Sequence, residues 1–204
     1  MQQAGLAGSP PTSSPSPIST ADALQEICHL LPSGEARAAE MLLGAMFPKP
    51  SSSTKRASWS PRRLARIFVR DGFTDRYVGE PLVFPGALRA LSVIAPSLFP
   101  YHPNWKQSCT HPLYWSHCAT IDHVVPIARG GLDDESNIVT TSMLRNSAKS
   151  NWTVEELGWP MPQAPAVSGW DGLLPWFCRE YERNEALRLE PPLQRWYDAA
   201  RRAG

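Results

Sequence analysis

Apolar residues recur at the spacing of an amphipathic helix in residues 21–31 and again in residues 35–47. Residues 32–34, Pro-Ser-Gly, separate the two stretches and favour a turn. The residues expected to form the apolar faces are Leu24, Ile27, Leu30, Leu31, Ala38, Met41, Leu42, Ala45 and Met46. The pattern therefore predicts a helical hairpin near the start of the chain.

A further helix is predicted after a serine-rich stretch. Ser60 followed by Pro61 is typical of a helix start, because the serine hydroxyl caps free backbone N–H groups and proline fits the first turn. The helix is expected to run to about Arg70. Its inward-facing residues are Leu64, Ile67 and Phe68. The other predicted helices cover residues 85–91, 173–189 and 193–200.

The hydrophobic pattern changes between residues 120 and 151. Residues 120–127 and 137–141 indicate two short strands, and residues 142–150 indicate a helix capped by Thr141 or Ser142. The sequence thus predicts an α+β fold, in which two short antiparallel strands and a helix are embedded in helical extensions.

Composition narrows the class of protein. The 204 residues include 21 prolines, which disfavours long helices, and the net charge is only +1, so nucleic-acid binding requires a local patch. No stretch approaches the roughly 18 consecutive apolar residues of a membrane span, so no membrane partner is expected. Four scattered cysteines are typical of a reducing compartment, which predicts a cytoplasmic location.

Positive charge is concentrated between Lys55 and Arg76. This segment holds seven basic and two acidic residues, a local balance of +5. Taken alone, such a segment is more often a solvated helix face than a binding surface. Its candidates for contacts with nucleic acid are Arg62, Arg63, Arg66 and Arg70.

The residues most suggestive of chemistry lie between Thr120 and Asn151. Asp122 and His123 are adjacent in the first predicted strand, where neighbouring side chains point to opposite faces. Both can reach one site only if the strand ends or bends there, and Pro126 together with glycines 130 and 131 favours such a break. On the following helix, Asn146 and Lys149 lie three residues apart and share a face.

A carboxylate, an imidazole and a carboxamide in one place suit the hydrolysis of a phosphodiester. Mg²⁺ prefers oxygen ligands and keeps several waters, so one carboxylate and one amide oxygen are enough to hold it. Histidine is the side chain most readily poised as a base near neutral pH. A metal beside such a base stabilises the charge that gathers in the transition state.

The spacing of these residues resembles that of the HNH endonucleases, whose fold is the ββα-metal or His-Me finger. The matching pattern is Asp122-His123-x2-Pro126-x3-Gly130-Gly131-x5-Asn137-x8-Asn146-x2-Lys149. The close match covers about 30 residues, and a weaker one extends over roughly residues 61–159. In structural terms the alternative is a plain strand-turn-helix with a hydrogen-bonded histidine and capping asparagines.

The resemblance implies a role for each matched residue. His123 corresponds to the general base that activates water, and Asn137 to the residue that pins the loop and orients the histidine. Asp122 and Asn146 correspond to ligands of a single Mg²⁺ or Mn²⁺ ion, which makes the chain an H-N-N variant. Arg129 and Lys149 are then candidates for contacts with DNA phosphates.

The sequence departs from the family where many members bind a structural zinc through two Cys-x-x-Cys motifs. Those four positions correspond to Asp75, Val78, Ser142 and Arg145, so no structural zinc is expected. Without zinc, apolar packing must hold the finger together, and two groups of residues are candidates for this packing. These are Phe73, Tyr77 and Val78, and, in an insertion of about 40 residues before Asp122, Trp105, Tyr114 and Trp115.

The insertion also contains cysteine and histidine residues, the usual ligands of zinc. They are His102, Cys109, His111, His117 and Cys118. Their spacing fits no zinc motif, so buried thiols and surface histidines are favoured over a second metal site.

The sequence therefore predicts a DNA endonuclease that leaves 5′-phosphate and 3′-hydroxyl ends. DNA is the expected partner, and a homodimer is left open. The rival functions are a non-catalytic DNA-binding protein that keeps the fold and a ribonuclease or nuclease toxin. The expected domains are a disordered arm (1–20), a helical hairpin with a linker (21–54), the nuclease domain (55–160) and a helical extension (161–204).

Overall fold

The computed structural model describes residues 18–47, 58–162 and 169–203. The chain divides into two compact units, residues 1–50 and residues 51–204. The expected arm and linker lie mostly outside the described residues. In the described part of the chain, no helix combines the length and the apolar character needed to cross a lipid bilayer.

The first unit is a pair of packed helices, α1 (Thr20–Leu30) and α2 (Ala36–Met46), which confirms the predicted hairpin. Ser19 caps α1 by accepting a hydrogen bond from the backbone of Asp22. The predicted apolar faces are wrong in part. The buried residues are Ala23, Ile27 and Ala39, whereas Leu24, Leu31 and Met41 are exposed, because small alanines let the two helices approach closely.

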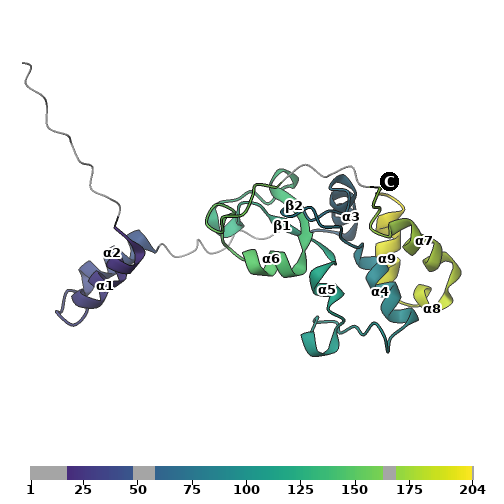
Figure 1. Cartoon of the computed structure of the whole chain (residues 1–204), viewed down its shortest axis with the longest axis horizontal. Helices are drawn as coiled ribbons and strands as arrows, with labels where there is room; N and C mark the ends of the chain where they lie inside the picture. Colours follow the sequence, from purple (N-terminus) through teal and green to yellow (C-terminus); the bar gives the residue numbers. More distant parts are fainter. Residues whose placement is uncertain (1–17, 48–57, 163–168, 204) are drawn as a thin grey trace, which may run out of the picture. The chain divides into compact units, whose positions relative to one another are not determined.

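The second unit is a mostly helical α+β fold with one two-stranded hairpin followed by a helix (Figure 1). Its helices and strands are α3 (Pro61–Arg70), α4 (Pro85–Ile94), α5 (Leu113–Ser116), β1 (Ala119–His123), β2 (Ile138–Ser142), α6 (Met143–Lys149), α7 (Leu174–Arg183), α8 (Glu185–Arg188) and α9 (Pro191–Ala200). Short 3-10 turns cover Gln107–Cys109, Ile127–Arg129 and Glu135–Asn137.

The predicted strand-loop-strand-helix is confirmed. β1 and β2 pair in antiparallel register, with Asp122 opposite Val139 and His123 opposite Ile138. Ser142 caps α6 by accepting a hydrogen bond from the backbone N–H of Arg145. β1 ends at His123, which is shorter than the predicted strand, and the loop that follows brings the chain back to β2.

The main core joins α3 to the C-terminal helices. Ser60 and Pro61 start α3 as predicted, and Phe68 is buried on its inner face beside Leu193 of α9 and Phe177 of α7. The predicted helix over 173–189 is interrupted at Asn184, whose side chain caps α8 instead. Since α9 packs against α3 and α4, the expected C-terminal extension is part of the same compact unit as the β1–β2 hairpin.

The insertion before β1 forms a small core of its own around Tyr114. The Tyr114 ring is buried beside Leu88 and Cys118, and Trp105 packs against this cluster. Burial raises the pKa of the Tyr114 hydroxyl, which pairs with Ser92 at 2.7 Å. The aromatic insertion is therefore a second packed support for the start of β1.

Candidate functional site

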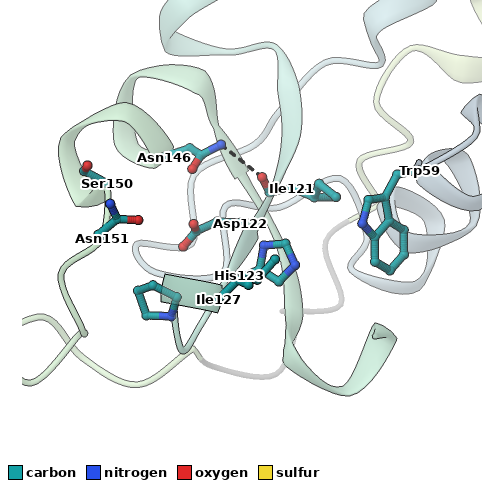
Figure 2. A pocket seen from close by; sticks show the side chains of 9 residues that line it. Trp59, Ile121, Asp122, His123, Ile127, Asn146, Ser150 and Asn151 are labelled. Carbon is teal, nitrogen blue, oxygen red and sulfur yellow. Dashed lines mark hydrogen bonds between the residues drawn. The ribbon is translucent and has the colours of Figure 1, made fainter. Parts of the chain in front are cut away.

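A pocket of about 250 Å³ opens where β1 ends beside α6 (Figure 2). Its lining combines residues from β1, from the loop after it, from α6 and from the segment before α3. They are Trp59, Ile121, Asp122, His123, Pro126, Ile127, Asn146, Ser150 and Asn151. Asp122, His123 and Asn146, which the sequence singles out, are thus brought to one place.

Asp122 is a nearly buried carboxylate with two strong partners. Tyr77 donates its hydroxyl hydrogen to Asp122 Oδ2 at 2.6 Å, and the Lys149 ammonium lies 3.0 Å from the same oxygen. Burial and the charge of Asp122 raise the pKa of the Tyr77 hydroxyl, so tyrosine remains a hydrogen-bond donor. Both partners fix Oδ2, which leaves the carboxylate immobile.

Lys149 does not lie where a phosphate contact was expected. Its side chain is fully buried, and Nζ donates to the carbonyl oxygen of His123 at 2.7 Å besides pairing with Asp122. A buried ammonium is retained only when it is paired and hydrogen-bonded, as here. The structure therefore corrects the sequence expectation: Lys149 ties α6 to the end of β1.

His123 is held by a carboxylate from the loop. Its Nε2 lies 2.9 Å from Asp133 Oδ1, and the same oxygen accepts a hydrogen bond from Trp59 Nε1 at 3.1 Å. A carboxylate accepts but does not donate, so Nε2 carries the hydrogen and the neutral ring keeps its lone pair on Nδ1. The hydrogen bond to Asp133 therefore leaves Nδ1 as the nitrogen of His123 that can accept a proton.

Asn137 closes the loop between the strands with both ends of its carboxamide. Oδ1 accepts from the backbone N–H of Val125 at 2.9 Å, and Nδ2 donates to the carbonyls of Val125 and Leu132, each at 2.8 Å. Gly131 passes so close that an added Cβ would stand 1.9 Å from the Val125 oxygen. These hydrogen bonds hold the segment that carries Asp133; the resemblance assigns Asn137 to pinning this loop and orienting the histidine, and that role stays a prediction.

Asn146 is oriented so that its oxygen is available to a ligand. Its Nδ2 donates to the carbonyl of Ile121 at 3.0 Å, and Figure 2 shows its oxygen on the side of the Asp122 carboxylate. Among the described residues, no group donates a hydrogen bond to Asn146 Oδ1 or to Asp122 Oδ1. An amide oxygen and a carboxylate oxygen that line one pocket and accept no hydrogen bond from the described residues are a donor set that fits a hard cation.

This pair of oxygens differs from a dense acidic metal site. Within the described ranges, no three histidine, cysteine, aspartate or glutamate side chains cluster closely enough to hold an ion. A cation at the pocket would therefore have one charged ligand, and water would complete its coordination, as is usual for Mg²⁺.

Three of the four positions that the resemblance matched to zinc cysteines, Asp75, Ser142 and Arg145, take part in a polar network. Asp75 is buried, and its Oδ2 accepts from Thr141 Oγ1 at 2.9 Å and from the Ser142 backbone N–H at 3.1 Å, with Arg145 Nε at 3.4 Å. The carboxylate thus joins β2 to the start of α6. The apolar residues expected to replace zinc at this place were Phe73, Tyr77 and Val78. Of these three, Tyr77 packs beside the network, against Val139 and other residues, whereas Val78 is exposed and Phe73 belongs to the main core.

A third buried carboxylate, Asp71, ties α3 to β2. Asp71 pairs with Arg70 at 2.9 Å and Arg76 at 2.6 Å, and it accepts from the backbone N–H of Thr140 at 2.8 Å. Burial alone would raise the pKa of this carboxyl, but the hydrogen bonds from Arg70 and Thr140 outweigh it and lower the pKa.

The cysteine and histidine residues of the insertion serve local structure. Cys118 is buried, and burial raises the pKa of its thiol. His111 stacks on Phe99, and His102 and His117 make hydrogen bonds to residues one or two positions away. Cys109 is exposed.

The basic candidates fall into two groups. Arg70 donates to the carbonyls of Glu135 and Ile138 besides pairing with Asp71, so it braces the loop. Arg63 lies over Trp59 and 3.7 Å from Glu135, and Arg129 pairs with Glu156 at 3.1 Å. Arg62 and Arg66 are exposed on α3, and no described carboxylate lies within ion-pair distance of either.

Three contributors to the site have no signal in the sequence spacing. Asp133 is one of two adjacent aspartates in the loop, Trp59 precedes the helix cap, and Tyr77 is recognisable only as an apolar anchor. Their hydrogen bonds to His123 and Asp122 depend on how the loops fold back on β1.

Comparisons of the chain with protein-family models, with curated proteins and with solved structures each give no significant match. A functional assignment therefore rests on the residues and their geometry.

Proposed function

We propose that the chain is a metal-dependent DNA endonuclease of the HNH, or ββα-metal, type. It hydrolyses phosphodiester bonds with Mg²⁺ or Mn²⁺ and leaves 5′-phosphate and 3′-hydroxyl ends. The observation that carries this proposal is the pocket itself, in which a carboxylate-held imidazole stands beside two ligand oxygens, Asp122 Oδ1 and Asn146 Oδ1, that accept no hydrogen bond from the described residues. The residue spacing of the sequence supports the same reading.

In the proposed reaction His123 is the general base. Its Nδ1 takes a proton from a water molecule, and the resulting hydroxide attacks phosphorus opposite the 3′ oxygen, whose bond to phosphorus breaks. The departing oxygen takes a proton from solvent water to become the 3′-hydroxyl, and His123 returns its proton to solvent. Asp133 holds the ring and stabilises the imidazolium that forms. A divalent ion held by Asp122 and Asn146 supplies electrostatic stabilisation of the charge on the phosphate and the departing oxygen. The network around Asp75 supports the fold without a structural zinc.

Activity of the purified full chain on supercoiled plasmid tests the proposal. With Mg²⁺ or Mn²⁺ we expect nicked or linear DNA, and none with EDTA. A DNA ligase should reseal the nicks, because it requires 5′-phosphate and 3′-hydroxyl ends. Binding without cleavage under every metal would support the non-catalytic rival, and preferential cutting of RNA in competition would support a ribonuclease.

Asp122→Ala and Asn146→Ala are each expected to raise the Mg²⁺ concentration needed for half-maximal cleavage. The physical reason is that a weakly held ion loses one of two protein ligands. The measurement is a Mg²⁺ titration of plasmid nicking. Ser147→Ala, an exposed change on the same helix, is the control and should leave the titration unchanged. Identical titrations for all three variants and the parent chain would remove both residues from the metal site.

Asp133→Asn is expected to lower kcat about 10- to 100-fold, the usual effect of losing a group that orients a functional histidine. DNA affinity and the Mg²⁺ titration should stay the same, because neither depends on the carboxylate charge. The matched control is Asp134→Asn, whose exposed side chain accepts hydrogen bonds from Ser136. Equal kinetics for the two variants, or a change in KM alone, would contradict the role of Asp133 as a positioning residue.

A further inference from the structure

A second hollow, of about 200 Å³, lies between the start of α3 and the end of α9. Its lining is rich in arginine and comes from segments far apart in the sequence. The residues are Ser60, Pro61, Arg62, Arg195, Asp198, Ala199 and Arg202. We propose that this arginine groove binds a backbone phosphate of the DNA strand beside the phosphate that is cut. The inference rests on the proposed function and adds the C-terminal helix to the DNA-binding surface.

The groove is positively charged, and its arginines are not used by the fold. The three arginines of the groove, Arg62, Arg195 and Arg202, are exposed. Within the described residues no carboxylate lies within ion-pair distance of any of them, and this holds for the neighbouring Asp198 as well. Three guanidinium groups and one carboxylate leave the groove with a balance of +2. Arg66, one turn beyond Arg62, extends this charge along α3. Exposed arginines held by a rigid framework are suited to phosphate oxygens.

The framework is rigid because both helices are anchored in the main core. α3 contributes Phe68 to this core, and α9 contributes Leu193 and Ala199. The positive end of the α3 dipole also opens at Ser60 and Pro61, which favours an anion in the groove.

The position of the groove connects it with the candidate catalytic pocket. Trp59 lines that pocket and bonds Asp133, and the next residue, Ser60, lines the arginine groove. Only the peptide bond between Trp59 and Ser60 separates the two linings along the chain. Because the two linings meet at consecutive residues of one segment, we place the phosphate of the groove on the same DNA backbone as the phosphate at His123.

Salt-dependent binding of a short fluorescent DNA duplex tests the groove, with the full chain in EDTA so that nothing is cut. Each phosphate contact contributes about 0.9 to the slope of log affinity against log salt. Arg195→Gln/Arg202→Gln should therefore flatten the slope by about 0.9, the contribution of the one phosphate bound in the groove, and weaken binding. The matched control, Arg179→Gln/Arg183→Gln, removes two exposed arginines of α7 and should keep the slope of the parent chain.

Equal slopes for the two double variants would overturn the proposal, whether both keep the parent slope or both lose the same amount. Binding of the parent chain to phosphatidylserine vesicles but not to DNA would overturn it too. Plasmid cleavage separates this result from the proposed function. If the parent chain cleaves plasmid and the Arg195→Gln/Arg202→Gln variant keeps the parent slope, only the proposal for the groove is wrong. If that variant has a flattened slope but the parent chain does not cleave, the proposed nuclease function is wrong and the groove still binds DNA.

Discussion

Replacing His123 with alanine is expected to slow DNA cleavage about 10²- to 10⁴-fold, the usual cost of losing a general base. DNA affinity in EDTA should be unchanged, because the proposed phosphate contacts lie on other residues. The fold should persist as well, since the His123 backbone carbonyl, which accepts from Lys149, is retained in the variant. The measurement is the rate of plasmid nicking together with duplex binding.

The matched control for this variant is His102→Ala. His102 lies in the insertion, and its ring accepts a hydrogen bond from the backbone N–H of Asn104. Its removal should leave the nicking rate within twofold or so of the parent chain, in line with a change remote from reacting groups. If His123→Ala retains the turnover of His102→Ala, His123 is not the base and the proposed mechanism is wrong.

Lys149→Met is expected to lower the free energy of unfolding by about 3–5 kcal/mol. Methionine fills the space of the lysine stem, but the Asp122 carboxylate loses its counter-charge while it stays buried, which is the costly way to break such a pair. The His123 carbonyl loses its donor at the same time. Urea unfolding, followed by circular dichroism, measures the change.

Two further variants make the Lys149 result specific. Lys106→Met replaces an exposed lysine and should change stability by no more than about 0.5 kcal/mol. Asp122→Asn combined with Lys149→Met should recover part of the loss, because no uncompensated charge then remains buried. A double variant as unstable as the sum of the two single ones would show that Asp122 and Lys149 do not interact.

The local elements could be predicted because their signals are local. The Ser-Pro start of α3 and the cap of α6, expected at Thr141 or Ser142, follow from the residues within one turn, whereas the first strand ends at His123 and not at residue 127 as predicted. The buried faces of α1 and α2 could not be predicted in this way. The small residues Ala23 and Ala39 are buried there in place of larger apolar ones, because they let the two helices pack closely. Hydrophobic periodicity depends on how apolar each residue is and carries no information about how closely two helices pack.

The candidate site divides in the same way. Asp122, His123 and Asn146 meet at the pocket because strand pairing and one helix bring them there, so their spacing carries the information. Lys149 shares that spacing, yet its long side chain turns inward to the charge of Asp122, a choice that depends on burial. Asp133 reaches His123 through a loop whose path is fixed by Asn137, which no pattern of apolar and polar residues encodes.

The packing of α3 against α9 has a consequence for synthesis on the ribosome. About 120 residues lie between the end of α3 and the start of α9, and the core between the two helices includes Ala119 at the start of β1. Such distant contacts form only after the intervening chain has been made. A nascent chain whose α9 is still in the exit tunnel has the β1–β2 hairpin but not the core beneath it. The candidate pocket therefore gains the core that supports β1 only after α9 has been made.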